Sequence, residues 1–255
     1  MTVQTIPIDA VLFDMDGTLV DTTPALTAAW AEFSEKYNLD YNHVVNTCHG
    51  HRAVENMKRF IPHLSQEEAE AEAARFENRI IEIAAAAKRQ RNVEGQITPI
   101  PGAQQLIEEI AKDRPASAQN PGWAIVTSAG QDYAERVYGA AEVSSPPKTF
   151  VTADHVTKGK PDPQPYLMGA DLVGADASRC VVVEDAPAGA VAGKRAGAKV
   201  IGLRTTHDEP ERLWDVGADY VVKDLSHVHA RWQGEQLMLD IDTEAKPPSA
   251  VHASL

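Results

Sequence analysis

Two carboxylates, Asp14 and Asp16, stand two residues apart directly after the apolar segment 10–13. An apolar run of this kind predicts a buried β-strand. In an open α/β sheet, ligands bind at the carboxyl ends of the strands, so both side chains are expected at such an end. Carboxylates placed there can hold a hard cation such as Mg²⁺, and one of them can attack an electrophile. A plain polar turn is the competing interpretation, because Asp16 is followed by Gly17 and this pair is a common turn signal.

Hydroxyl and ammonium groups are found near two further apolar runs. Thr127 and Ser128 follow the segment 123–126, where a hydroxyl and backbone N–H groups could hold phosphate oxygens. Capping of a helix N-terminus is the alternative role for these residues. Lys160 lies in the segment 158–163, whose two prolines favour a rigid loop. A lysine fixed in such a loop is a suitable point charge for a phosphate, whereas a solvated loop lysine is the alternative.

A second acidic pair, Glu184 and Asp185, follows the strongly apolar segment 180–183. Adjacent acids at the end of a buried strand are costly unless they bind something, and a metal ion would offset that cost. The helix expected just beyond them would favour an anion at its N-terminus. An acid pair, a hydroxyl, a lysine and a second acid pair thus occur in order, each at a predicted strand end or in the loop after one. Together they favour a site that handles phosphate with a metal ion.

A parallel sheet is needed to bring these strand ends together. The apolar segments are mostly near-continuous runs of Val, Ile and Leu, which suit a parallel sheet buried on both faces. We expect strands at 11–16, 123–129, 149–153, 180–185, 199–205 and 219–224. Helices are expected between them at 101–112, 131–141, 163–174 and 187–198. The alternation predicts an α/β fold with a doubly wound, Rossmann-like parallel sheet.

A helical insertion interrupts this alternation at residues 23–97. The segment has helical periodicity and no strong strand, and its second half is rich in Ala, Glu and Arg. Ser65 and Glu68 have the spacing of a capping box, and the glutamates of 67–77 are expected on a solvated face. We therefore predict a core made of residues 1–22 and 98–242, and a separate helical domain at 23–97.

The end of the chain contains two different segments. Residues 234–242 alternate between apolar and polar types, which predicts an additional strand at the edge of the sheet. Residues 243–255 lack any periodicity, and we expect them to be disordered.

The composition argues against several classes of function. The net charge is −13 and no block of Lys and Arg is present, so we expect binding to neither nucleic acid nor membranes. No apolar run approaches the length of about 18 residues that a membrane span needs, and no signal peptide is recognisable. Cys48 and Cys180 are far apart and are expected to be free thiols. These features predict a cytoplasmic protein and, without an exposed apolar stripe, a monomer.

The order and wording of the motifs resemble the haloacid dehalogenase superfamily of phosphotransferases. The motifs are FDMDGT at 13–18, IVTSAG at 125–130, KGKPDPQPY at 158–166 and VVVEDAPAG at 181–189. The resemblance extends from about residue 8 to residue 225. HGHR at 49–52 and GADYVV at 217–222 resemble one fungal branch, which contains 2-deoxyglucose-6-phosphate phosphatases and glycerol phosphate phosphatases.

The resemblance implies roles for the first three motifs. Asp14 is expected to be the nucleophile that forms an aspartyl-phosphate. Asp16 is expected to protonate the leaving alkoxide and then to activate water. Thr127, the backbone of Ser128 and Lys160 are expected to bind the phosphoryl group. An acid at the position of Asp16 favours release of an alcohol from a phosphate ester.

The resemblance also implies a magnesium site. Mg²⁺ is expected to be held by Asp14, by the backbone carbonyl of Asp16 and by Asp185, with Glu184 as a direct ligand or as a partner of a ligand. The ion would shield the charge between the anionic nucleophile and the anionic phosphate.

In this superfamily, a helical insertion at this place is a cap that closes over the site and contacts the leaving group. We expect His49, Gly50 and Arg52 to serve the substrate, with Gly50 allowing a loop to approach the core closely. Surface positions are the alternative for Arg52, and ordinary loop positions are the alternative for His49.

The sequence therefore predicts a Mg²⁺-dependent phosphatase that acts on a small phosphate ester, a sugar phosphate or a polyol phosphate. The alternative within enzymes is a phosphotransferase that resembles β-phosphoglucomutase. Those mutases carry a histidine after the first motif, about where this chain has Leu26, so hydrolysis is favoured over transfer. A non-catalytic binding module is the third hypothesis, and the presence of Asp14, Asp16 and Lys160 argues against it.

Overall fold

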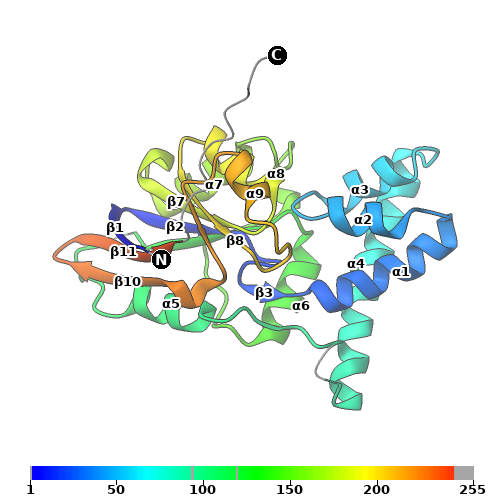
Figure 1. The fold of residues 1–255 in the computed structure, drawn as a ribbon, viewed down its shortest axis with the longest axis horizontal. Coiled ribbons are helices and arrows are strands. Elements are labelled where there is room, and N and C mark those ends of the chain that lie inside the picture. Colours follow the sequence, from blue (N-terminus) through cyan, green and yellow to red (C-terminus); the bar gives the residue numbers. More distant parts are fainter. Residues whose placement is uncertain (1, 93–94, 119, 244–255) are drawn as a thin grey trace.

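The computed structural model describes residues 2–92, 95–118 and 120–243. Its centre is a six-stranded parallel sheet with the strand order β6-β5-β2-β7-β8-β9 (Figure 1). The strands are β2 (Ala10–Phe13), β5 (Trp123–Val126), β6 (Phe150–Val151), β7 (Cys180–Glu184), β8 (Lys199–Leu203) and β9 (Tyr220–Val222). All six predicted strands are present, but each ends before the predicted boundary. The residues beyond the strand ends leave the sheet and form the loops of the site described below.

Helices cover both faces of this sheet, which confirms the doubly wound α/β fold. The helices are α5 (Ala103–Ala111), α6 (Gln131–Ala141), α7 (Gln164–Val173), α8 (Pro187–Arg195) and the short α9 (Glu211–Asp215). Alternate residues of β2 face opposite sides, as strand geometry requires. Phe13 belongs to the apolar cluster that includes Leu106 of α5, whereas Leu12 belongs to the cluster that includes Tyr166 of α7.

Four helices form the insertion: α1 (Thr23–Tyr37), α2 (Tyr41–Thr47), α3 (Ala53–Phe60) and α4 (Gln66–Gln90). Figure 1 shows them to one side of the sheet, beyond the strand ends. The chain enters the insertion after β3 (Val20–Asp21) and returns through β4 (Thr98–Pro99), and these two short strands pair antiparallel.

The insertion has its own apolar interior. Trp30 of α1 is 1% exposed, and its ring contacts Phe33, Phe60 and Phe76, with 4.3 Å between its ring centroid and that of Phe76. The predicted capping box of α4 is confirmed, since Ser65 and Glu68 exchange side chain-to-backbone hydrogen bonds. Packing and capping together explain why these helices form.

The prediction for the end of the chain was wrong in one respect. The strand β11 (Gln236–Thr243) is not an edge strand of the parallel sheet; it is the central strand of a separate antiparallel sheet. Its neighbours are β1 (Thr2–Ile8) and β10 (Val228–Gln233), neither of which was predicted. The strand also includes Thr243, so the predicted disordered tail began one residue too early. The rest of that prediction, residues 244–255, lies outside the described residues.

The remaining described residues contain short 3₁₀ helices at Ala153–His155, Ala177–Arg179 and Leu225–His227. Cys48 and Cys180 are both buried and free, as predicted. Within the described ranges, no helix combines the length and the apolar character needed to cross a bilayer.

Candidate active site

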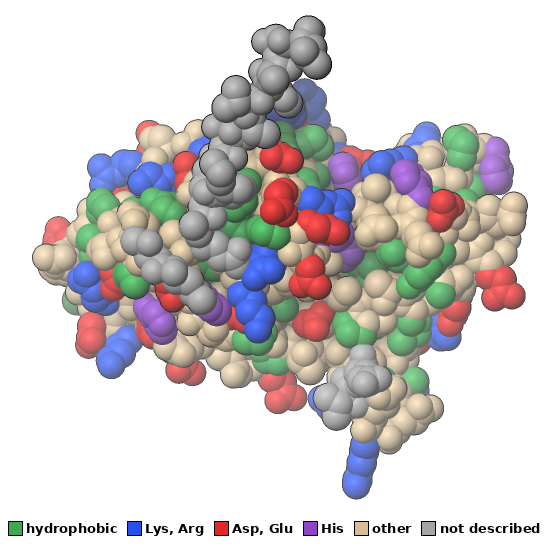
Figure 2. All heavy atoms as spheres, viewed as in Figure 1, with side chains coloured by type: hydrophobic (Ala, Val, Ile, Leu, Met, Phe, Trp, Pro, Cys, Tyr) green, Lys and Arg blue, Asp and Glu red, His purple; other side chains and the backbone are tan. Residues whose placement is uncertain are grey.

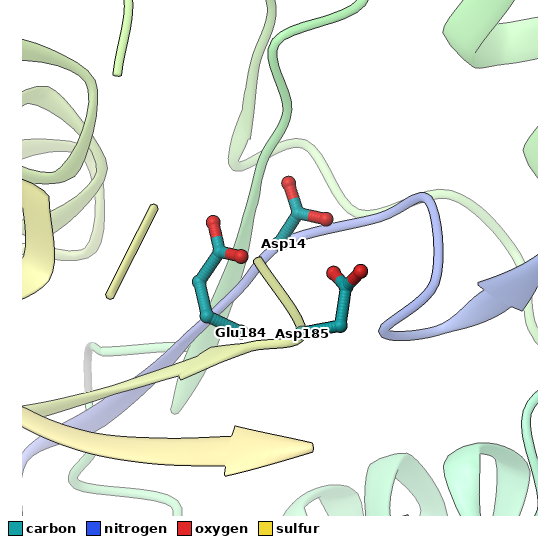
Figure 3. A group of neighbouring side chains, drawn as sticks. All are labelled: Asp14, Glu184 and Asp185. Atoms are coloured by element: carbon teal, nitrogen blue, oxygen red, sulfur yellow. The ribbon is translucent and has the colours of Figure 1, made fainter. Parts of the chain in front are cut away.

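The carboxyl ends of neighbouring strands bring the predicted acids together. Asp14 follows β2, and Glu184 and Asp185 stand at the end of β7, which pairs directly with β2. One carboxylate oxygen from each of the three lies within 4.8 Å of those of the other two. Figure 3 shows the three carboxyl groups directed toward a common space. The predicted meeting of the two acidic motifs is therefore observed.

Lys160 lies between two of these acids and is buried. Its Nζ atom donates to Oδ1 of Asp14 at 2.5 Å and to Oε1 of Glu184 at 2.7 Å. Burial lowers the pKa of this ammonium group, but the two carboxylates outweigh burial and the net pKa is raised. Lys160 is thus a fixed cation and not the solvated loop lysine that the sequence left open.

Glu184 has both of its carboxylate oxygens engaged. Oε1 accepts from Lys160 and from the hydroxyl of Tyr166 at 2.7 Å, and Oε2 accepts from the backbone N–H of Ala186 at 3.1 Å. A further Cβ on Gly189 of α8 would lie 1.6 Å from Oε1, so this glycine leaves the room that Glu184 occupies. Glu184 therefore fixes the position of Lys160 and of the loop after β7 through hydrogen bonds.

Asp185 is held by two hydroxyl groups. Its Oδ1 atom accepts from Thr18 at 3.1 Å and its Oδ2 atom accepts from Thr206 at 2.7 Å. Burial, together with the nearby charge of Glu184, raises the pKa of Asp185 to about 7. Burial also raises the pKa of Asp14.

The buried cluster thus contains three carboxyl groups and one ammonium group. Charges of one sign that are removed from water are unfavourable unless a counter-charge is near, and Lys160 supplies only one. Hard oxygen donors in a compact group are the ligands that Mg²⁺ prefers. The donor set of Asp14 and Asp185 therefore fits this ion.

The side chain of Asp16 is not part of that cluster among the described residues. Its Oδ1 atom accepts from the hydroxyl of Thr22 at 2.9 Å and from the hydroxyl of Tyr133 at 3.0 Å. Burial raises the pKa of Asp16, although both hydrogen bonds lower it in part. A ligand role for the backbone carbonyl of Asp16 stays a prediction. The contact between Tyr133 and Asp16 was not predicted. In the sequence, only the place of Tyr133 in the helix that follows Thr127 points to it.

The predicted phosphate-binding hydroxyls stand at the end of β5. Thr127 is buried, and its Oγ1 atom accepts from the backbone N–H of Ala129 at 3.1 Å. This bond fixes the loop, whereas the N-cap residue of α6 is Gly130. Ser128 donates through Oγ to the backbone carbonyl of Gly50 at 2.9 Å, a contact between the core and the insertion. Thr127 and Ser128 therefore do not cap α6.

A cavity lies between the strand ends and the insertion. The core contributes Asp14, Asp16, Thr127, Ser128, Ala129 and Tyr133, and the insertion contributes Leu26, Trp30, Cys48, His49, Gly50, His51, Ala53, Asn56, Phe76, Glu77 and Ile80. The catalytic and phosphate-binding candidates thus share one space with residues of the insertion, except Lys160, which does not border the cavity but binds Asp14, which does.

The structure separates the predicted insertion residues. His49 and Gly50 border the cavity, whereas Arg52 is directed elsewhere: it donates to Glu55 at 2.8 Å and to the carbonyl of Thr157 at 3.1 Å. Gly50 has a φ of +79°, and a Cβ there would lie 2.8 Å from the Cβ of Ala186. The expected close approach of this loop to the core is therefore present.

His49 is held as a neutral imidazole. Burial, together with the nearby His207 and Arg212, lowers its pKa to about 4. The ring centroids of His49 and His207 are 5.4 Å apart, so His207, for which we predicted no role, lies beside the insertion loop.

The prediction of a solvated glutamate face at 67–77 was wrong for two residues. Glu72 is buried against Lys36, with 3.0 Å between Oε2 and Nζ. Glu77 borders the cavity, and its Oε1 atom accepts from the backbone N–H of Gly130 at 3.3 Å. Burial raises the pKa of Glu77 to about 7. Helical periodicity shows which residues share a face, but the packing partner of that face is decided by the core.

The parallel sheet, its acidic strand ends and the buried lysine are typical of a phosphoryl-transfer enzyme with a Rossmann-like α/β fold. The chain belongs to the haloacid dehalogenase-like hydrolases, a family that matches residues 8–197. It is a phosphoric monoester hydrolase, as its relatives are.

Curated relatives are similar along most of their length. Hexitol phosphatase A of Escherichia coli is 39% identical over 217 residues, which cover 85% of this chain and 91% of the relative. Glycerol-1-phosphate phosphohydrolase 2 of Saccharomyces cerevisiae is 34% identical over 227 residues, 85% of this chain and 82% of the relative. 2-Deoxyglucose-6-phosphate phosphatase 2 of the same yeast is 34% identical over 232 residues, which cover 87% of this chain and 89% of the relative. The predicted resemblance to the fungal branch is therefore confirmed.

Solved structures share the fold. A hydrolase from Pseudomonas syringae superimposes with a TM-score of 0.70 at 28% identity, covering 86% of this chain and 95% of that one. A β-phosphoglucomutase from Clostridium difficile superimposes with a TM-score of 0.67 at 23% identity, covering 86% of this chain and 92% of that one. At this identity, the similarity to the β-phosphoglucomutase shows a shared fold and nothing more.

Proposed function

We propose that this protein is a Mg²⁺-dependent phosphatase that hydrolyses a small sugar phosphate or polyol phosphate through an aspartyl-phosphate on Asp14. The observation that carries the proposal is the difference in surroundings between two aspartates, Asp14 and Asp16, that border one cavity. Asp14 is paired with Lys160 and lies in the acidic cluster, whereas Asp16 lies outside it and is held by hydroxyl groups. The first environment suits a nucleophile and the second suits a group that exchanges a proton.

In the first step, an oxygen of Asp14 attacks phosphorus and the bond between phosphorus and the ester oxygen breaks. Lys160 binds Oδ1 of Asp14, so we assign the attack to Oδ2. Asp16 gives its proton to the leaving alkoxide, which departs as an alcohol. Because the pKa of Asp16 is raised, a larger fraction of this carboxyl group is protonated than would be the case for an aspartate in water.

In the second step, the carboxylate of Asp16 removes a proton from water as the water oxygen attacks phosphorus. The bond between phosphorus and Asp14 breaks, inorganic phosphate leaves, and both aspartates return to their initial states. Thr127, the backbone of Ser128 and Lys160 bind the phosphoryl oxygens. Mg²⁺, held by Asp14, Asp185 and the backbone carbonyl of Asp16, would supply the counter-charge that lets two anions approach.

We further propose that the helical insertion, residues 23–97, acts as a cap over the cavity. Three contacts join it to core loops beside the cavity: Ser128 to Gly50, Gly130 to Glu77, and Arg52 to Thr157. Closure of the cap would exclude water and place insertion residues on the leaving group. His49 and Gly50 border the cavity, whereas Arg52 does not and is bound to Glu55 and to the carbonyl of Thr157.

The substrate class rests on the names of the relatives. They act on hexitol phosphate, glycerol 1-phosphate and 2-deoxyglucose 6-phosphate, which are monophosphates of polyols or of a sugar. The mutase hypothesis has only the shared fold in its favour, and Leu26 borders the cavity near the place where those mutases carry a histidine.

The test is release of inorganic phosphate, with and without Mg²⁺, from glycerol phosphate, 2-deoxyglucose 6-phosphate, hexose 6-phosphates, sorbitol 6-phosphate and β-glucose 1-phosphate. We expect Mg²⁺-dependent release, and we expect Asp14→Asn to lower kcat by a factor of about 10⁴ or more because the nucleophile is lost. Asp171→Asn, on the exposed face of α7, is the matched control and should leave kcat unchanged.

Release that survives Asp14→Asn would contradict the aspartyl-phosphate. Conversion of β-glucose 1-phosphate to glucose 6-phosphate in the presence of a bisphosphate primer, with little free phosphate, would instead favour the mutase.

A further inference from the structure

The charged side chains that border the cavity are all acidic. Asp14, Asp16 and Glu77 border it, and no lysine or arginine does so among the residues that the structure describes there. Lys160 is bound to Asp14 and Glu184, and Arg52 is bound to Glu55 and to a core loop. The part of the cavity that is formed by the insertion therefore offers no cation to a leaving group.

The insertion side of the cavity also contains an acceptor without a donor. Asn56 of α3 is 5% exposed and borders the cavity. Its Nδ2 atom donates to the carbonyl of Cys48 at 2.9 Å, which fixes the orientation of the amide. Its Oδ1 atom is buried and has no hydrogen-bond partner. A buried acceptor of this kind gains from a ligand that donates a hydrogen bond.

Glu77 supplies a second acceptor on the same side. One of its oxygens accepts from Gly130, and its neighbours at the cavity include the apolar side chains of Phe76 and Ile80. His49 adds no positive charge, because burial keeps its imidazole neutral. A hydroxyl of the substrate can donate to either acceptor, whereas a carboxylate or a second phosphate can donate to neither when ionised.

We propose that Asn56 and Glu77 are specificity-determining residues that restrict the leaving group to a neutral polyol or sugar and reject leaving groups that carry a second anionic charge. This inference rests on the proposed phosphatase function and narrows its substrate class. An anionic group in the cavity would be removed from water beside a carboxylate and an unpaired carbonyl, with no cation to compensate. A hydroxyl would instead pair with acceptors that otherwise stay unpaired.

The first experiment compares two substrates that differ only at the end remote from the phosphate. Sorbitol 6-phosphate ends in a CH₂OH group, and 6-phosphogluconate ends in a carboxylate at the same carbon. At pH 8, where Glu77 is ionised, we expect kcat/KM for sorbitol 6-phosphate to exceed that for 6-phosphogluconate by about a hundredfold or more. Equal values for the two esters would overturn the inference and leave the phosphatase function standing.

The second experiment uses Glu77→Gln, which keeps the size of the side chain and removes its charge. The ratio of the two kcat/KM values should fall about tenfold, mainly because 6-phosphogluconate becomes a better substrate. Glu70→Gln is the matched control, since Glu70 is exposed on the same helix, and it should leave the ratio unchanged. An unchanged ratio in Glu77→Gln would remove Glu77 from the proposal.

The third experiment separates recognition by Asn56 from a general defect of folding. Asn56→Leu should lower kcat/KM for sorbitol 6-phosphate about tenfold and change kcat/KM for p-nitrophenyl phosphate less than about twofold, because that leaving group has no further hydroxyl to donate. A parallel loss for both esters would show that Asn56 acts only in packing. Absence of phosphate release from every ester with the wild-type protein would instead contradict the proposed function itself.

Discussion

At the scale of single residues, the most informative contact is the one between Tyr133 and Asp16. Tyr133 and Thr22 both donate to Oδ1 of Asp16, so we assign the proposed proton transfer to Oδ2. A hydroxyl that donates to a carboxylate favours its ionised form and lowers its pKa. Burial acts in the opposite direction and prevails, so the pKa of Asp16 is raised overall.

Tyr133→Phe should therefore raise the pKa of Asp16 further. Since Asp16 must be protonated to act as the acid, the alkaline limb of the profile of kcat/KM against pH should move to higher pH by about one unit. Looser positioning of the carboxyl should also lower kcat about tenfold. The measurement is the pH profile with an alkyl phosphate ester.

Tyr138→Phe is the matched control for this prediction. Tyr138 lies in the same helix and is buried, but its hydroxyl pairs with Ser144 and does not border the cavity. This variant should keep the wild-type profile. A Tyr133→Phe profile that coincides with that of the wild type would show that the hydrogen bond to Asp16 has no part in proton transfer.

At the scale of elements, the loop between α2 and α3 is the place where the insertion comes closest to β7 and α8. Gly50 has a positive φ and lies against Ala186, while its carbonyl accepts from Ser128. Only a residue without a Cβ adopts this conformation and this close approach at little cost.

Gly50→Ala should strain the backbone and push the loop away from the core. We expect the free energy of unfolding to fall by about 1 kcal/mol and kcat/KM to fall about tenfold, because the insertion no longer meets Ser128 as closely. Stability is measured by urea unfolding, and activity by phosphate release.

Gly139→Ala provides the comparison. Gly139 lies in α6, and a Cβ there would have no neighbour within 4 Å. The exchange should raise stability by up to about 1 kcal/mol through helix propensity and leave kcat/KM unchanged. Equal activity in Gly50→Ala and Gly139→Ala would argue against a functional approach of the loop.

At the scale of the whole molecule, the chain carries a net charge of −13, and Figure 2 shows acidic and basic side chains scattered over one face. The protein also encloses an acidic cluster that Lys160 only partly neutralises. A cation that binds the folded state and not the unfolded state stabilises the fold in proportion to the logarithm of its concentration. Metal binding should therefore be visible in stability as well as in activity.

We expect Mg²⁺ at about a hundred times its Kd to stabilise the metal-free protein by about 2.7 kcal/mol and to raise Tm by several degrees. Sodium chloride at the same ionic strength should not do so. Asp185→Asn should abolish most of the shift, because it removes one of the carboxylates of the cluster. The measurement is differential scanning calorimetry after treatment with a chelator, and a shift that persists in Asp185→Asn would place the ion elsewhere.

Much of the fold and of the candidate site could be predicted from the sequence. Continuous apolar runs specify strands that are buried on both faces, and the carboxyl ends of parallel strands meet at one edge. Asp14, Glu184 and Asp185 were therefore expected together, and they lie together. The insertion was visible as a long break in the strand–helix alternation, since periodicity is a local property of the chain.

Other features were decided only by the tertiary structure. The alternating segment at the end of the chain predicted β11 but not its place as the central strand of a separate sheet. That place depends on pairing with β10 and with β1, and β1 is more than 200 residues away in the sequence. Tyr133, Asn56 and Glu77 carry no motif, and Glu77 stands in a run of residues typical of a solvated helix.

The physical reason is the same in each case. A sequence pattern fixes which side chains share one face of an element, because the periods of helix and strand are set by local backbone geometry. It does not fix what lies opposite that face, since packing against distant segments decides this. The acidic core of the site thus followed from the sequence by itself, whereas the residues that hold Asp16 and border the cavity on the side of the insertion became visible only when the insertion was seen against the sheet.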